Sequence, residues 1–171
     1  MTTKFYAQRD QYSCGAVATL NILKWKDPSI TYKHDFRQIK RKVKCDRDGT
    51  NTDDVLALLS KDKELKLSKL KPRLTPSRKL KEISTLNSKF EIILFEIYYW
   101  NLKTGKENGH LALITNTTDQ FVKFANIMRR ENKSIDISIY SKSNLLKMLK
   151  GTFKTKTDRF KIHDIYFIER I

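Results

Sequence analysis

The sequence predicts an α+β domain in which helices form the N-terminal half and an antiparallel sheet forms the C-terminal half. Three stretches with helical patterns, separated by capping and breaking residues, occupy the first third of the chain. The second half is rich in Ile, Phe and Tyr, which are common in strands. Because the chain has 171 residues, 39% of them hydrophobic, we expect residues 1–171 to form a single domain.

Capping and breaking residues set the expected bounds of the first helices. We expect helices at Cys14–Lys26, Tyr32–Val43 and Asp53–Ser60. Ser13 is the predicted N-cap of the first helix and Thr52 that of the third, because a hydroxyl oxygen accepts from the free N–H groups of a first turn. The segment Asp27-Pro28-Ser29 ends the first helix. The second helix is basic, and the residues from Cys45 to Gly49 form a loop after it.

The rest of the chain is predicted to be mainly strands. Residues 61–81 hold nine basic and two acidic residues, and we expect a short strand and a surface connection there. We then expect a basic helix near Ser77–Ile83, strands at Phe90–Trp100, Leu111–Thr115, Gln120–Ala125, Ile135–Tyr140 and His163–Ile168, and a helix from the cap Ser141 to Lys150. The strands on either side of Thr117, Thr118 and Asp119 form a hairpin.

The charge of the chain bears on its partners and location. A net charge of +16 favours an acidic partner, although a Lys-rich, solvated surface from an AT-rich genome has the same composition. Nucleic acid is less favoured than protein, because Arg is the minority cation. The N-terminus has no apolar core of a signal peptide, and the longest apolar stretch, Ile92 to Trp100, is too short for a membrane helix. We therefore expect a cytoplasmic protein, of the producing cell or of an infected host cell, with no membrane partner.

Cys14 is the first candidate for chemistry. It stands where a loop becomes the first turn of a buried helix, so free backbone N–H groups and the helix dipole favour its thiolate, which is a nucleophile. Gly15 after it leaves room for a substrate. Gln8, six residues earlier, can supply a side-chain amide that forms an oxyanion hole with the N–H of Cys14, and Gln11 is a weaker alternative. A small buried thiol is the other role open to a lone cysteine.

His110 is the candidate base. It follows Gly109 and opens the strand Leu111–Thr115. If the hairpin is symmetric about Thr118, Ile114 faces Val122 and His110 faces Asn126, which can then orient the imidazole. A shift of the register by one residue would undo this pairing. Otherwise His110 is a strand-edge histidine without a role.

The other titratable residues give weaker signals. His34 lies in a basic helical stretch and is expected at the surface, and His163 has no evident partner. Cys45 is an expected exposed loop thiol that can oxidise, and a Cys14–Cys45 disulfide would silence the nucleophile. The Cys and His residues are scattered without the spacing of metal ligands, so we expect no metal and no cofactor.

Taken together, Gln8-x5-Cys14-Gly15, Gly109-His110 on a strand, and Asn126 sixteen residues later resemble the papain-like cysteine peptidases. The pattern is most similar to the branch of bacteriocin-processing, double-glycine-leader peptidases and their standalone relatives, and Gly49-Thr50 resembles a further element of that branch. The resemblance implies a papain-like fold with a helical lobe against the sheet and a cleft between them. It departs in two ways, since the branch commonly has Asp where this chain has Asn126, and its transporter-linked members continue into membrane spans and an ATPase.

The resemblance implies a thiol protease that hydrolyses a peptide or isopeptide bond through a thioester on Cys14, with His110, Asn126 and Gln8 as the other catalytic residues. An amidase, a deamidase or an acyl or amine transferase would use the same residues. The expected partner is a protein or peptide with an acidic region. A function from another class is a basic binding module for nucleic acid or an acidic protein, and a third is a catalytically inactive decoy.

Overall fold

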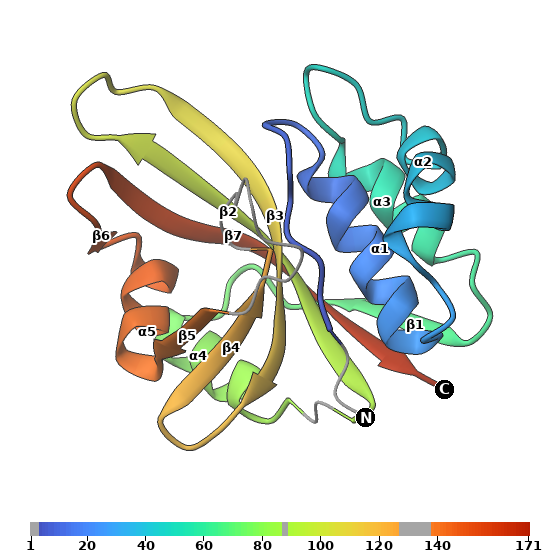
Figure 1. The fold of residues 1–171 in the computed structure, drawn as a ribbon. Helices are drawn as coiled ribbons and strands as arrows, with labels where there is room; N and C mark the ends of the chain where they lie inside the picture. Colours follow the sequence, from blue (N-terminus) through green and yellow to red (C-terminus); the bar gives the residue numbers. More distant parts are fainter. Residues whose placement is uncertain (1–3, 87–88, 127–137) are drawn as a thin grey trace.

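The computed structural model describes residues 4–86, 89–126 and 138–171 (Figure 1). A seven-stranded sheet with the path β1-β7-β2-β3-β4-β5, to which β6 is added beside β7, forms the centre, and every neighbouring pair is antiparallel. The helices are α1 (Cys14–Lys26), α2 (Tyr32–Lys42), α3 (Thr52–Leu59), α4 (Pro76–Ser84) and α5 (Lys142–Lys150). The strands are β1 (Leu65–Lys69), β2 (Glu91–Asn101), β3 (Glu107–Thr117), β4 (Phe121–Ala125), β5 (Ser138–Ser141), β6 (Phe153–Lys154) and β7 (Asp158–Arg170).

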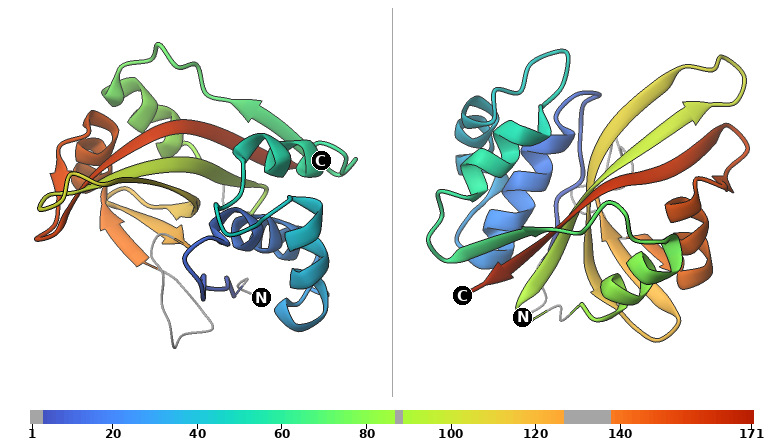
Figure 2. Two further views of the ribbon diagram at one scale, coloured as in Figure 1. Left: turned by 90° about the horizontal axis from the view of Figure 1, so that it is seen from above. Right: turned by 180° about the vertical axis from the view of Figure 1, so that it is seen from behind.

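The sheet has a hydrophobic cluster on each face, because the side chains of β2 alternate between the two faces. Ile92 and Leu94 pack with α1, α2 and α3, whereas Ile93, Phe95 and Ile97 pack with α4 and α5. The three N-terminal helices therefore form one lobe, and α4 and α5 cover the opposite side of the sheet (Figures 1 and 2). The predicted α+β class, with a helical lobe packed on an antiparallel sheet, is confirmed.

The structure confirms the expected helices and corrects two of their caps. Asn51, and not Thr52, caps α3, since its side chain accepts from the backbone N–H of Asp53. Thr52 is the first residue of the helix, and its hydroxyl donates to Glu96 on β2. Ser13 occupies the N-cap position of α1, but its buried hydroxyl makes no hydrogen bond.

The strands agree with the prediction in place and differ in length. The short strand expected within residues 61–81 is β1, which pairs with β7 at the edge of the sheet. The last strand is longer than predicted, and β6 was not predicted at all. Of the strand expected at Ile135–Tyr140, residues 138–140 lie in β5 and the first three lie outside the described residues. Across the described ranges, no helix combines the length and the apolar character needed to span a bilayer.

Candidate active site

The N-terminal segment before α1 runs between the helical lobe and the sheet, and two buried Asn side chains hold it there. Asn21, on α1, accepts from the backbone N–H of Tyr6 at 2.7 Å and donates to the carbonyl of Tyr6 at 2.9 Å. Asn126, just after β4, accepts from the backbone N–H of Gln8 at 3.2 Å. Because both side chains bind backbone atoms, the path of the segment does not depend on the side chain of Gln8.

A turn built by Asp10 leads this segment into α1. The Asp10 carboxylate accepts from the backbone N–H groups of Tyr12 and Ser13, at 3.1 and 2.7 Å. Its other oxygen lies 3.9 Å from the ammonium of Lys40 on α2. The carboxylate thus satisfies N–H groups that precede the helix, whereas Ser13, the predicted N-cap, makes no side-chain cap hydrogen bond to the first turn.

The start of α1 packs closely against the loop that precedes α3. A Cβ atom added to Gly15 would lie 2.6 Å from Cβ of Thr50. This contact explains why glycine is required at position 15 next to the Gly49-Thr50 element. The loop approaches the turn that carries Cys14 so closely that only a hydrogen atom fits in place of a side chain. The loop then forms one wall of the cleft beside Cys14.

We expect Gly15→Ala to destabilise the protein by about 1–3 kcal/mol, because the new methyl group overpacks this contact. Urea unfolding of Gly15→Ala, Thr50→Gly and the double variant would measure the coupling. Gly109→Ala is the matched control, since its added Cβ would lie 3.6 Å from the ring of Tyr98, an ordinary contact. Additive effects of the two substitutions would show that Thr50 does not set the requirement for Gly15.

Cys14 lies against the free edge of β3. Strand β4 ends at Ala125, so the backbone of β3 around Leu111 is left for other partners. Burial raises the pKa of the Cys14 thiol, and hydrogen bonds from the backbone N–H groups of Leu111, Gly15 and Cys14 itself offset this only in part. The N–H groups at the helix start favour the thiolate, as predicted, but desolvation outweighs them and the net pKa of the Cys14 thiol is raised.

Asn126 connects the other three predicted site residues. Its side-chain amide donates to the carbonyls of Cys14 and Leu111, at 3.1 and 3.0 Å, while its oxygen accepts from Gln8. Its own backbone carbonyl meets Nε2 of His110. The side chain is completely buried, and its backbone has a left-handed φ of 57°.

The predicted hairpin register is wrong, although it brought the correct two residues together. Ile114 pairs with Phe124 and not with Val122. The register of β3 against β4 also shifts by one residue between Ile114 and Asn116. Asn126 is therefore not cross-strand from His110, and it reaches the imidazole through its backbone carbonyl rather than its side chain. A carbonyl only accepts, so Nε2 of His110 is the donor in this contact.

Gln8 and Gln11 differ in a way that separates the two oxyanion candidates. Gln8 is buried and lines a cavity of about 400 Å³ together with His110 and Gly109. Its Oε1 is buried without a hydrogen-bond partner among the described residues. Gln11 is exposed at the rim. The fixed amide of Gln8 is thus the better candidate for an oxyanion donor.

A larger cavity of about 610 Å³ contains both Cys14 and His110. Its walls come from the loop at residues 47–52 on the helical side and from β2 and the start of β3 on the sheet side. His110 and Gly109 line both cavities, so the two form one cleft that passes the thiol and the imidazole. A nucleophile, a base and an amide donor therefore face one groove.

The remaining Cys and His residues lie around this groove or away from it. His34 is exposed on α2, as predicted. Cys45 is half-buried rather than exposed, because its sulfur packs 3.6 Å from the carbonyl of Tyr12, and both cysteines are free thiols. Burial also raises the pKa of the Cys45 thiol.

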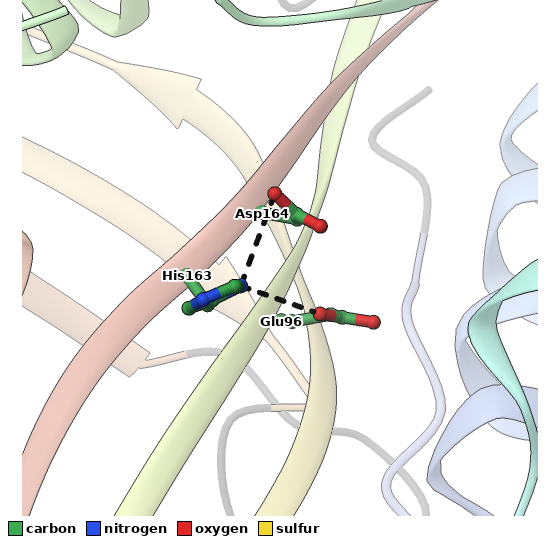
Figure 3. A group of neighbouring side chains, drawn as sticks. All are labelled: Glu96, His163 and Asp164. Carbon is green, nitrogen blue, oxygen red and sulfur yellow. Dashed lines mark ion pairs between the residues drawn. The ribbon is translucent and has the colours of Figure 1, made fainter. Parts of the chain in front are cut away.

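His163, for which no partner was predicted, has two carboxylates beside it. Its Nδ1 lies 4.0 Å from Glu96 and 3.8 Å from Asp164, as Figure 3 shows. One atom of each residue lies within 4.8 Å of the others, a spacing that allows a metal ion. However, Lys69 already binds Asp164 at 2.8 Å, and the hydroxyl of Thr52 binds Glu96. We therefore describe the group as an ion-pair cluster.

Sequence reasoning missed Asp10, Asn21 and Glu96. Asn21 could have been identified from the sequence, since it is a polar residue inside the apolar stretch of α1. Asp10 could also have been identified, because an Asp that precedes a helix start by a few residues often forms a turn with the backbone. Glu96 interrupts an apolar strand, and an isolated acid in such a place faces a polar site or a partner.

Known structures share this fold. The chain is similar to the peptidase domain of Streptococcus ComA, a bifunctional ABC transporter involved in a quorum-sensing pathway, with 12% identity, a TM-score of 0.56, and 95% of this chain and 98% of that chain covered. It is also similar to a double-glycine-motif protease from an AMS/PCAT transporter in complex with the leader peptide, with 11% identity, a TM-score of 0.52, and 92% and 88% covered. No family model and no curated protein matches the sequence. At such identities the likeness shows the fold, which is that of papain-like peptidase domains.

Proposed function

We propose that this protein is a cysteine peptidase that cleaves a peptide or isopeptide bond through a thioester on Cys14. The observation that carries the proposal is the position of Asn126, which binds the backbone at Gln8 and Cys14 and meets the ring of His110. Gln8, Cys14 and His110 are thereby held around one cleft on a peptidase-domain fold. A similar structure in complex with a leader peptide supports a peptide as substrate.

In the proposed reaction, Nδ1 of His110 takes the proton of the Cys14 thiol as the sulfur attacks the substrate carbonyl. The amide of Gln8 and the N–H of Cys14 donate to the oxyanion. The imidazolium then gives its proton to the leaving amine, and a thioester forms. A water molecule, deprotonated by Nδ1, hydrolyses the thioester and restores the thiol. Because burial raises the pKa of Cys14, the imidazole is required for the first proton transfer.

The alkylation rate of Cys14 against pH tests whether the thiol and the imidazole form a pair. Iodoacetamide labelling is followed by peptide mass spectrometry, with Cys45 as the control in the same molecule. We expect Cys14 to react at neutral pH in the native protein. In His110→Ala, labelling should become appreciable only above the ordinary thiol pKa of about 8.5, because burial outweighs the backbone N–H groups and no imidazole takes the proton. Identical pH profiles in the two proteins, with Cys14 no faster than Cys45, would refute the proposal and favour a basic binding module.

Replacement of Gln8 tests the oxyanion hole. We expect Gln8→Ala to lower kcat by about 10²–10³-fold, with a much smaller effect on KM, because the lost donor acts mainly in the transition state. The fold of the segment should survive, since its hydrogen bond to Asn126 uses the backbone of Gln8. The matched control is Gln11→Ala, at the exposed neighbouring amide. Equal losses in both variants, or a loss in KM alone, would exclude Gln8 as the donor.

A further inference from the structure

The cleft has the opposite charge balance from the rest of the protein. The chain carries a net charge of +16, yet three carboxylates and only one Lys or Arg line the larger cavity. The carboxylates are Asp48, Glu96 and Glu107, and the cation is Arg47. Among the described residues, none of the three carboxylates is paired with a Lys or Arg. A substrate in this cleft therefore meets a negative wall on a positive molecule.

Glu96 is placed at this wall by an irregularity in the sheet. The pairing of β2 with β7 shifts between Phe95 and Ile97, so that two residues, His163 and Asp164, lie opposite Glu96 (Figure 3). Such bulges redirect side chains and are frequent beside active sites. The Glu96 side chain keeps 20% of its surface exposed and accepts from the hydroxyl of Thr52 across the cleft. His163 is the cation beside it when protonated, and Lys69 is occupied by Asp164.

Tyr98 and Glu107 continue the wall toward the mouth of the cleft. On one face of the sheet, Glu96, Tyr98 and Trp100 follow one another on β2, and Tyr98 pairs with Gly109 while Trp100 pairs with Glu107. Gly109 has no side chain, and a Cβ added there would lie 3.6 Å from the ring of Tyr98, which lines the cavity and also makes an edge contact with the ring of His163, 5.5 Å between centroids. An aromatic face between two carboxylates is a suitable environment for an ammonium or guanidinium group.

We propose that this part of the cleft, defined by Glu96, Tyr98 and Glu107, binds a basic side chain of the substrate. The inference rests on the proposed peptidase function and specifies its substrate as a peptide with Lys or Arg near the scissile bond. The carboxylates attract the cation, and the ring of Tyr98 packs against its aliphatic stem. The net charge of the chain predicted an acidic substrate, and the charges that line the cleft favour the reverse.

Peptide binding tests this inference without requiring catalysis. The probes are short fluorescein-labelled peptides with one common background sequence composed of Ala, Leu and Gly. In each probe, one position of this background is replaced by Lys, norleucine or Glu. They are titrated into Cys14→Ala protein by fluorescence anisotropy. We expect one position at which Lys binds about five- to tenfold more tightly than norleucine and Glu binds most weakly, with the preference falling as salt rises. The combined change Glu96→Gln and Glu107→Gln should abolish the preference, and Glu82→Gln, on the exposed face of α4, should leave it unchanged.

The outcomes separate this inference from the proposed function. Tighter binding of the Glu peptides, no binding of any Lys peptide, or a Lys preference that persists in the double Gln variant would overturn the basic subsite. Hydrolysis of the same peptides by the native protein is measured in parallel. Cleavage without any charge preference would refute the subsite alone, whereas a Lys preference in binding without cleavage would refute the peptidase and retain the subsite.

Discussion

Replacing His110 by Ala is expected to lower kcat for peptide hydrolysis by about 10³-fold or more, and Cys14→Ala is expected to remove it. The loss should be large because burial raises the pKa of the Cys14 thiol, which disfavours the thiolate when no base takes the proton. Nε2 of His110 meets the carbonyl of Asn126, and in the proposed reaction the other ring nitrogen, Nδ1, takes the thiol proton. Combining both substitutions should cost little more than either alone, because the two groups act as a unit.

The measurement is the cleavage of a mixed peptide library by the native protein and the variants, followed by mass spectrometry of the new termini. His34→Ala is the matched control, because His34 is exposed on α2, away from the cleft. Circular dichroism of each variant excludes unfolding as the cause of a loss. Native-level cleavage by His110→Ala would show that another group accepts the proton, and it would refute the assignment of His110 as the base.

The candidate site residues could be chosen from the sequence because the choice depends on residue types and on coarse order along the chain. A Cys-Gly at a helix start and a Gly-His beside a strand pattern place a thiol and an imidazole where a helical lobe meets a sheet, although β3 begins at Glu107, so that His110 lies within the strand and does not open it. The structure adds that Gln8 is brought to the same groove by its backbone. The fold class was predictable for a similar reason, since helical and strand patterns occupy separate halves of the chain.

The connections between these residues were not predictable, because they depend on local irregularities. The hairpin turn is longer than predicted, so that Thr117 pairs with Val122 and Asn126 is out of line with His110, and the left-handed backbone of Asn126 turns its carbonyl toward the imidazole. No residue pattern in a short hairpin encodes such a shift. The bulge opposite Glu96 is a local irregularity of the same kind. It lies where Glu96 adds a carboxylate to the wall of the cleft, and the net charge of the chain did not predict that carboxylate.

Asn126→Asp is expected to be more harmful than its small change in shape suggests. The amide nitrogen of Asn126 donates to the carbonyls of Cys14 and Leu111, and a carboxylate would place negative charge against both oxygens in a fully buried site. We expect the unfolding free energy to fall by about 3 kcal/mol or more at neutral pH. We expect peptidase activity to fall strongly as well, because the same amide holds the backbone of Cys14. The family branch that the sequence resembles commonly has Asp in the corresponding place.

The pH dependence of stability distinguishes this cause from a general packing defect. Burial and the two carbonyls should raise the pKa of the introduced carboxyl above its ordinary value of about 3.9, because the protonated form can donate to one of them. A group with a raised pKa in the folded state stabilises it at low pH, and this contribution is lost as the pH rises through that pKa. Relative to the native protein, Asn126→Asp should thus be least destabilised in acid and most destabilised at neutral pH, whereas Asn126→Ala should show a constant difference. Urea unfolding across this pH range would measure both, and parallel curves for the two variants would show that the amide does not act as the donor that joins Cys14 to Leu111.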